Sequence, residues 1–306
     1  MSARCTLCPR RCGTARDSAH FGFCGVGARA VVCRAAAHFG EEPCISGTRG
    51  SGAVFFAGCN LRCVFCQNHA ISRGGAGQEA DTAALRDIFL RLRDQGVHNL
   101  NLVTPTHFSN VIAEALAGLE LGIPVVWNSS GYESVEQLRQ LEGLVQVYMP
   151  DLKYADRALA KRYSGAEDYP ETALAALTEM YRQTGPFVLD EAGLLQRGVL
   201  VRHLILPGAA ENSLRVMDLV EDHLPPRHIL FSLMSQYTPM PGTERFCELG
   251  RRITWEEFAR CRSYLDFSEL KYGFYQEPDS AGAEMIPAFD GTGVCPPEKD
   301  KAPLRL

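Results

Sequence analysis

Three cysteines in the first quarter of the chain have the spacing of a cluster-binding loop. Cys59, Cys63 and Cys66 form a C-x3-C-x2-C pattern in the segment GCNLRCVFCQN, directly after a short apolar run. Iron–sulfur clusters are held by cysteine thiolates, and three thiolates on one loop can ligate three corners of a cubane. The next cysteine downstream is Cys247. Because no fourth ligand lies nearby, we expect a [4Fe–4S] cluster with one open metal position, as in open catalytic sites.

A zinc site is the alternative for the same loop. It would take its fourth thiolate from the cysteines of residues 1–44 and would be a closed structural site. Zinc sites more usually pair two C-x2-C units, and this loop contains one. The spacing therefore favours iron–sulfur chemistry over zinc.

A second set of cysteines lies near the N-terminus. Cys5, Cys8, Cys12 and Cys24 follow the pattern C-x2-C-x3-C-x11-C. Four thiolates at these spacings can close around Zn²⁺ or around an auxiliary iron–sulfur cluster. Chance clustering without any ligand is the remaining interpretation. We expect a second metal centre here, either zinc or iron–sulfur.

Composition limits the class of protein. Nine of the twelve cysteines fall within the first 66 of the 306 residues. The N-terminus lacks the apolar stretch of a signal peptide, and no apolar run reaches the ~18–20 residues of a membrane helix. Since thiols stay reduced in the cytosol, the clustering favours metal chemistry over a disulfide framework. We expect a cytoplasmic protein without a membrane partner.

The net charge of −5 is unevenly spread along the chain. Residues 1–34 hold six arginines and one acidic residue, Asp17, so the rest of the chain carries the negative excess. A basic segment of this kind could contact RNA. It could equally offset thiolates gathered around a metal, and no aromatic stacking pattern accompanies the arginines. We favour the second interpretation and expect no nucleic-acid partner.

Strand and helix signals alternate from residue 49 onward. Six short apolar runs are typical of buried strands: 50–58, 99–106, 123–131, 145–154, 198–208 and 228–239. Amphipathic stretches with helix signals occur at 82–96, 134–143, 211–224 and 254–267. The last of these begins with Thr-x-x-Glu, the pattern of a capping box. The alternation predicts βα units around a parallel sheet with right-handed crossovers.

This periodicity leaves open whether the sheet is doubly wound or a partial barrel. Polar residues follow the apolar strand bodies as TPTH, NSSG, DLK, LPG and SQYTP. The carboxyl ends of parallel strands are where ligands bind in such folds, so we expect one shared site there. We divide the chain into a Cys-rich metal-binding segment (1–48), a core (49–277) and a C-terminal loop or tail (278–306) with disordered last residues.

The three-cysteine loop, with Phe65 before its last cysteine, resembles the signature of the radical S-adenosylmethionine (SAM) superfamily. The resemblance implies an α/β fold, a partial (βα)6 TIM-like barrel, here with an N-terminal Cys-rich extension. It implies that SAM binds the free iron through its amino and carboxylate groups. The reduced cluster would cleave SAM to methionine and a 5′-deoxyadenosyl radical that abstracts hydrogen. The protein supplies binding and orientation in such chemistry.

Within the superfamily, residues 50–240 resemble the activating enzymes of glycyl radical enzymes, in particular pyruvate formate-lyase activating enzyme and its relatives. Asp151-Leu152-Lys153 resembles a D-L-K segment that contacts SAM. By that resemblance Lys153 meets the methionine carboxylate or the ribose, as a compact point charge. Asp151 would meet a ribose hydroxyl or a cation. The resemblance also implies an electron donor such as flavodoxin or ferredoxin, and a glycyl radical protein as one candidate hydrogen donor.

The same resemblance assigns further residues to the SAM site. The positions that hold a monovalent cation beside SAM correspond to Asn128, Ser129 and Met149, although an aspartate is expected at position 128. The remaining cofactor-binding residues are Phe65, Arg202 and the segment that replaces the family's Gly-Gly-Glu, represented by Thr104, Thr106 and His107. At the end of the sixth strand the family has a SAM-contacting histidine, which this chain replaces with Gln236 and Tyr237. The catalytic candidates are Arg202, Gln236 and Tyr237.

Three functions remain open at this stage. Our leading hypothesis is an enzyme that makes a 5′-deoxyadenosyl radical, either as an activating enzyme or as a relative acting on a smaller substrate. The second is a metal-organised binding module that does not cleave SAM, which the missing Gly-Gly-Glu segment favours. The third is an RNA-modifying radical SAM enzyme, which rests on the basic N-terminus and predicts salt-dependent RNA binding.

Overall fold

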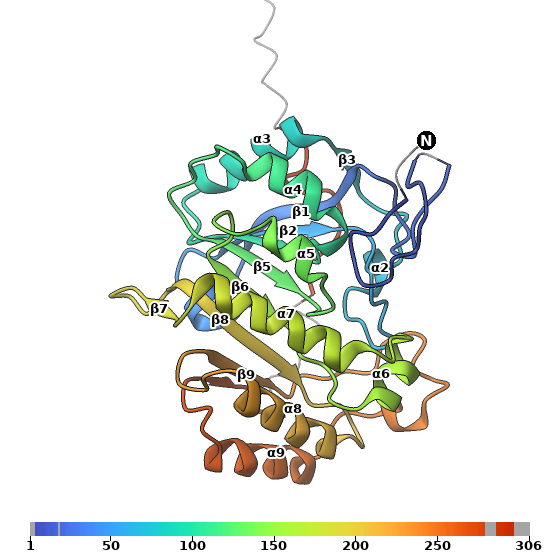
Figure 1. Cartoon of the computed structure of the whole chain (residues 1–306), viewed down its shortest axis with the longest axis vertical. Helices are drawn as coiled ribbons and strands as arrows, with labels where there is room; N and C mark the ends of the chain where they lie inside the picture. Colours follow the sequence, from blue (N-terminus) through green and yellow to red (C-terminus); the bar gives the residue numbers. More distant parts are fainter. Residues whose placement is uncertain (1–3, 18, 279–285, 297–306) are drawn as a thin grey trace, which may run out of the picture.

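The computed structural model describes residues 4–17, 19–278 and 286–296. Six parallel strands form the body of the protein, in the spatial order β9-β8-β6-β5-β4-β2 (Figure 1). Each lies within a run predicted to be a strand or overlaps it closely. They are β2 (Ser51–Phe56), β4 (Leu100–Val103), β5 (Val125–Ser129), β6 (Val147–Pro150), β8 (Leu195–Leu204) and β9 (Leu230–Met234). The described sheet stays open, which confirms the expected partial barrel.

Within the described residues, four further strands extend the sheet. β1 (Ala30–His38) runs antiparallel to β2, and β3 (Gln78–Ala80) runs antiparallel to β1. β10 (Gly273–Tyr275) adds in parallel to β9, and β7 (Val188–Leu189) forms a hairpin with β8. β1 comes from residues 1–48, which the sequence analysis set apart as a Cys-rich metal-binding segment, and it pairs with β2 of the core.

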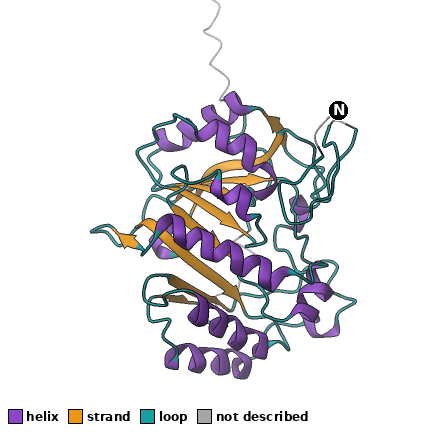
Figure 2. Cartoon of the chain, viewed as in Figure 1, coloured by secondary structure: helices purple, strands orange, loops and turns teal. Residues whose placement is uncertain are grey.

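Most of the helices lie on one face of the sheet (Figure 2). The four predicted helices are present as α3 (Thr82–Asp94), α5 (Val135–Arg139), α8 (Ala210–His223) and α9 (Trp255–Phe267). The capping box of α9 is confirmed, since Thr254 and Glu257 exchange both hydrogen bonds. The helices that were not predicted are α1 (Pro43–Ser46), α2 (His69–Ser72), α4 (Ser109–Leu116), α6 (Arg157–Ser164) and α7 (Tyr169–Thr184). No helix in the described part of the chain is both long and apolar enough to span a bilayer.

Alternate residues of the strands enter two apolar cores, as the period of a strand requires. Trp127 and Tyr148 belong to the larger core, and their neighbours Val126 and Val147 to the smaller one. The smaller core also receives Ile45 from α1 and includes Cys44, Met149, Leu195, Leu200 and Leu230. α1 therefore fills the inner face of the sheet below the carboxyl ends of the strands.

The C-terminal segment returns to the sheet at β1. The backbone N–H of Ala35 donates to the carbonyl of Thr292 at 2.8 Å, and Phe289 contacts Phe55 edge-on with ring centroids 5.5 Å apart. Residues 286–296 are thus packed against β1 rather than trailing away. The rest of the expected tail, 279–285 and 297–306, lies outside the described residues.

Candidate functional site

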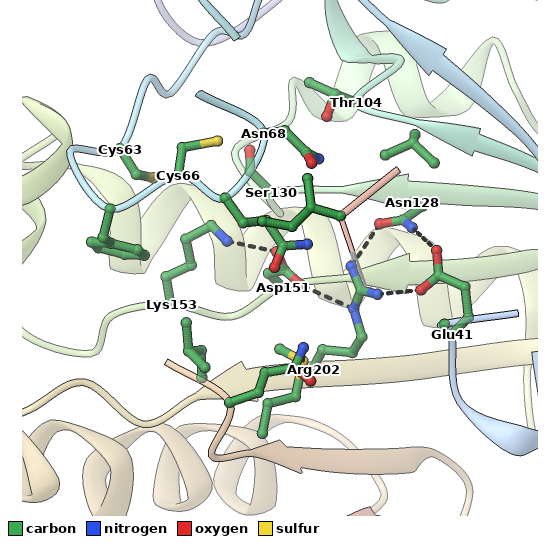
Figure 3. A pocket seen from close by; sticks show the side chains of 18 of the residues that line it. Glu41, Cys63, Cys66, Asn68, Thr104, Asn128, Ser130, Asp151, Lys153 and Arg202 are labelled. Carbon is green, nitrogen blue, oxygen red and sulfur yellow. Dashed lines mark hydrogen bonds and ion pairs between the residues drawn. The ribbon is translucent and has the colours of Figure 1, made fainter. Parts of the chain in front are cut away.

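One cavity lies at the carboxyl ends of the parallel strands, and the three-cysteine loop forms part of its wall (Figure 3). Most of the residues predicted from strand ends line it. They are Phe65, Thr104, Asn128, Ser129, Asp151, Lys153, Arg202, Gln236 and Tyr237, together with Cys59, Cys63 and Cys66. The structure thus brings together side chains that are up to 178 positions apart in the sequence.

The loop between β2 and α2 holds the three thiols in a buried setting. Cys59 and Cys63 are buried, Cys66 is half-buried, and none of the three forms a disulfide. The Sγ of Cys63 accepts a hydrogen bond from Ser164 Oγ at 3.0 Å, and Cys59 Sγ accepts one from the Leu61 N–H at 3.3 Å. Burial raises the pKa of the Cys63 thiol and raises that of Cys66 to about 12. A bound metal reverses this preference, because it deprotonates a coordinating thiol.

The donor set fits a cluster rather than a single ion. Among residues 4–17, 19–278 and 286–296, no three Cys, His, Asp or Glu side chains converge so that they could hold one metal ion. In a cubane each thiolate binds a different iron, so the ligands need not meet at one point. The ammonium of Lys153 lies within electrostatic range of Cys63 and Cys66, which suits an anionic centre.

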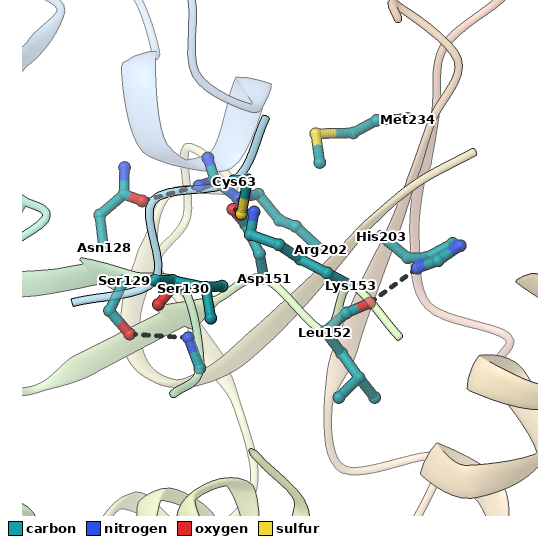
Figure 4. A network of polar contacts seen from close by, with 12 residues as sticks. Cys63, Asn128, Ser129, Ser130, Asp151, Leu152, Lys153, Arg202, His203 and Met234 are labelled. Atoms are coloured by element: carbon teal, nitrogen blue, oxygen red, sulfur yellow. Dashed lines mark hydrogen bonds and ion pairs between the residues drawn. The ribbon is translucent and has the colours of Figure 1, made fainter. Parts of the chain in front are cut away.

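Lys153, Asp151 and Arg202 form a network of charges beside this loop (Figure 4). Lys153 Nζ donates to one carboxylate oxygen of Asp151 at 2.6 Å, and Arg202 Nε donates to the other at 2.9 Å. The three side chains are only 13–18% exposed. Asp151 therefore bridges two cations, one at the end of β6 and one on β8.

These charges hold one another in the ionised state. Burial alone would raise the pKa of Asp151, but the guanidinium of Arg202 and the ammonium of Lys153 outweigh it and lower that pKa. Burial likewise opposes the charge of Lys153, yet the Asp151 carboxylate raises its pKa. An ammonium has three N–H donors, and among the described residues Lys153 uses one of them on Asp151. The others are available to a ligand in the cavity.

Glu41 completes the network and was not predicted from the sequence. Its Oε2 accepts from Arg202 Nη1 at 2.9 Å, and its Oε1 accepts from the amides of Asn101 and Asn128 at 3.0 and 3.1 Å. Arg202 Nη2 donates in turn to Asn128 Oδ1 at 2.6 Å. The only signal for Glu41 in the sequence is a pair of glutamates before Pro43 at the start of α1.

Three of the predicted cofactor-binding residues lie elsewhere. Thr106 Oγ1 donates to Glu133 at 2.7 Å, and His107 Nε2 bonds the Ala57 carbonyl at 2.8 Å. The short 3-10 turn η1 (Thr106–Phe108) directs both side chains into the protein, where burial lowers the pKa of His107 to about 4. The side chain of Met149 belongs to the smaller core. These three side chains do not line the cavity.

Thr104 is the member of the replacement segment that does line the cavity. It directly follows β4 and has a φ of 60°, a left-handed conformation that β-branched residues rarely adopt. Its N–H donates to the carbonyl of Asn128 at 2.8 Å, which fixes it against the next strand. Backbone strain of this kind concentrates at functional sites.

Five buried polar atoms of the cavity-lining side chains have no hydrogen-bond partner among the residues that the structure describes. They are Glu42 Oε2, Asn68 Oδ1, Ser130 Oγ, Gln236 Oε1 and Gln276 Oε1. Leaving such an atom unpaired costs about 1–3 kcal/mol. Because these atoms belong to side chains that line a cavity next to the three thiols, they fit a polar ligand bound there.

The N-terminal cysteines lie directly behind the three-cysteine loop. The carbonyl of Cys24 accepts a hydrogen bond from the N–H of Cys59 at 3.2 Å. The guanidinium of Arg10 donates to the carbonyls of Asn60 and Ser164 at 2.9 and 2.8 Å. The N-terminal segment and the loop are therefore joined by one backbone hydrogen bond and by the side chain of Arg10.

Comparison with known proteins adds three similarities. A family model described as the Radical SAM superfamily matches residues 53–196. An uncharacterized protein of Methanocaldococcus jannaschii is 28% identical over 266 residues, which cover 84% of this chain and 72% of that protein. The crystal structure of SuiB from Streptococcus suis gives a TM-score of 0.49 at 15% identity, covering 72% of this chain and 47% of SuiB. The chain thus matches about half the length of SuiB.

Proposed function

Because residues 53–196 match the family model of the Radical SAM superfamily, we propose that this protein cleaves SAM reductively at a [4Fe–4S] cluster held by Cys59, Cys63 and Cys66. When bound, the reduced cluster supplies the electron that breaks a carbon–sulfur bond of SAM and frees a 5′-deoxyadenosyl radical for hydrogen abstraction. The observation that carries the proposal is one cavity that combines these three thiols with unpartnered polar atoms and Lys153.

The charged network would hold SAM next to the loop. The ammonium of Lys153 has further N–H donors available for the methionine carboxylate. Asp151 fixes the position of Lys153 through their 2.6 Å hydrogen bond. For Arg202 we propose a positioning role in place of the SAM contact that the resemblance implied. Its guanidinium is bound to Asp151, Glu41 and Asn128, so we assign it as a positioning residue rather than a catalytic one.

Aromatic side chains would shape the cavity and exclude water. Phe65 contacts Tyr154, Tyr163 and Tyr237 edge-on, with ring centroids 6.3–6.4 Å apart. The hydroxyl of Tyr237 donates to the Leu249 carbonyl at 2.7 Å. We therefore expect the ring of Tyr237, rather than its hydroxyl, to contact a ligand in the cavity. Of the three catalytic candidates, Gln236 alone has an unpartnered side-chain atom. We assign Gln236 to direct contact with the ligand.

A more specific proposal concerns the molecule that gives up the hydrogen atom and the partner proteins. The resemblance at Asp151–Lys153 favours activation of a glycyl radical protein, with flavodoxin or ferredoxin as the one-electron donor and the cytoplasm as the location. The test is to incubate the reduced protein and SAM with a candidate glycyl radical protein. A glycyl radical signal in electron paramagnetic resonance (EPR) supports activation, and SAM cleavage without any such signal contradicts it for that candidate.

Anaerobic reconstitution tests SAM cleavage itself. Reduced wild-type protein with SAM should yield 5′-deoxyadenosine, and Cys63→Ala should not. Cys261→Ala is the matched control, because Cys261 is a fully buried cysteine in α9 that does not line the cavity. Equal yields from wild type and Cys63→Ala would refute the proposal.

A further inference from the structure

We propose that Cys5, Cys8, Cys12 and Cys24 hold a second iron–sulfur cluster, immediately behind the loop that carries Cys59. The inference concerns the N-terminal segment and does not depend on what the first cavity binds. It rests on how the four thiols gather, on a buried cation among them and on their contact with the core loop.

The four thiols lie near one another in the N-terminal segment. Cys8 lies within electrostatic range of Cys5 and Cys24, and Cys24 lies within range of Cys5 and Cys12. A Cβ placed on Gly22 would meet the Sγ atoms of Cys24 and Cys12 at 3.2 and 3.5 Å. A side chain at this position would therefore press on Cys24 Sγ and would contact Cys12 Sγ, so Gly22 marks a point where the two thiols lie close together.

Arg16 supplies a buried positive charge among these thiols. It is 4% exposed, and its Nη1 and Nη2 donate to the carbonyls of His107 and Gly27 at 2.7 and 2.6 Å. Its Nη1 is also 3.9 Å from Cys5 Sγ. Within the described part of the chain its Nε has no hydrogen-bond partner, and its Cδ lies 3.7 Å from the same Gly22 Cβ position that the two thiols approach. A buried N–H donor left free beside thiols fits the sulfur atoms of an anionic cluster.

The arrangement favours a cluster over zinc. Structural zinc needs four ligands around one ion, with sulfur at about 2.3 Å. Over the described ranges of the chain, no three cysteine, histidine or acidic side chains converge in that way, at either cysteine set. In a cluster each thiolate binds its own iron, so the four thiolates need not surround a single ion.

The N-terminal set of cysteines is hydrogen-bonded to the three-cysteine loop. The carbonyl of Cys24 accepts from the N–H of Cys59 at 3.2 Å, so a ligand of one set is bonded to a ligand of the other. Gly58 makes this contact feasible, because a Cβ there would lie 2.6 Å from the Cys24 oxygen and its φ is 81°. A centre bound at the N-terminal set would therefore fix the backbone of the core loop.

Metal analysis of oxygen-free protein tests the site without any activity assay. The wild type should hold about eight irons per chain, as two [4Fe–4S] clusters would require. The double variant Cys5→Ser/Cys12→Ser changes the two least buried thiols and should hold about four. Cys247→Ser, another exposed cysteine outside both sets, should match the wild type.

A second variant separates this inference from the proposed function. Replacing Cys59, Cys63 and Cys66 together with alanine should leave about four irons, all at the N-terminal set. Iron retained there supports the second cluster even if the first cavity never cleaves SAM. Zinc in place of iron at the N-terminal set, or no metal at all in this triple variant, would overturn the inference.

Discussion

The hydroxyl of Ser164 donates a hydrogen bond of 3.0 Å to the Sγ of Cys63, across 101 positions of sequence. The two residues meet because α6 ends against the cysteine loop, where the N–H of Val64 also donates to the Tyr163 carbonyl at 2.9 Å. Arg10, in the N-terminal segment, donates a hydrogen bond to the carbonyl of Ser164. Three distant parts of the chain thus determine where the Cys63 thiol lies.

Ser164→Ala should lower the reduction potential of the cluster held by Cys63. The hydrogen bond stabilises the additional negative charge of the reduced state, and such bonds to sulfur tune cluster potentials. A bond that contributes ~1 kcal/mol corresponds to roughly 40 mV for a one-electron couple. A redox titration followed by EPR measures the shift. Ser164→Thr keeps the hydroxyl and serves as the control, and an unchanged potential in Ser164→Ala would contradict this role.

Arg202→Lys should weaken SAM binding by roughly tenfold to a hundredfold, about 1.4–2.8 kcal/mol. The guanidinium donates hydrogen bonds to Asp151, Glu41 and Asn128 at once. An ammonium lacks the planar arrangement of N–H donors that these three bonds require. Titration calorimetry with cluster-loaded protein gives the Kd. The control is Arg197→Lys, an exposed arginine on the same strand. Equal Kd values for the Arg202 variant and wild type would show that the network does not position the SAM site.

Thr104→Gly should stabilise the fold and weaken SAM binding at the same time. A threonine at φ of 60° carries strain of about 1–3 kcal/mol, which glycine relieves, while the more flexible unfolded chain offsets about 1 kcal/mol of that gain. Urea unfolding measures stability and calorimetry measures the Kd for SAM. A loss of stability argues against strain at this position, and an unchanged Kd argues against a role in the site.

Glu133 should make the protein less stable as the pH rises from about 4.5 to about 7. Its carboxylate accepts hydrogen bonds from Thr106 and Trp127, and burial raises its pKa from 4.5 to about 7. The folded state therefore binds this proton more tightly than the unfolded state does. The contribution is full below the unfolded pKa and is lost as the pH rises through 7, at most ~3 kcal/mol.

Urea unfolding across this pH window, compared between wild type and Glu133→Gln, measures the effect. Glutamine keeps an acceptor for Thr106 and Trp127 but binds no proton, so its stability should vary less with pH. Parallel curves for the two proteins would assign the pH dependence to other groups.

The six central strands could be predicted because parallel strands buried on both faces appear as continuous apolar runs. Most of the cavity-lining residues could be predicted because such strands present their polar residues at one common edge. β1 was missed because four of its nine residues are alanine, which has little preference for strands.

Other features depend on tertiary contacts that no local pattern records. Glu41 acquires its role only when α1 enters the inner face of the sheet and brings it to Arg202. Thr106 and His107 were assigned to the site from their position after a strand, but a single 3-10 turn directs them away from it. Ser164 has no sequence signal as a partner of Cys63, since the two meet only through the packing of α6.

The most direct test of the central claim is EPR with hyperfine detection on the reduced, oxygen-free protein mixed with SAM labelled at its amino nitrogen and carboxylate. If Cys59, Cys63 and Cys66 leave one iron open to SAM, the cluster spectrum should change when SAM is added and should show coupling to the labelled atoms. A spectrum that SAM leaves unchanged, with no coupling to the label, would contradict the account.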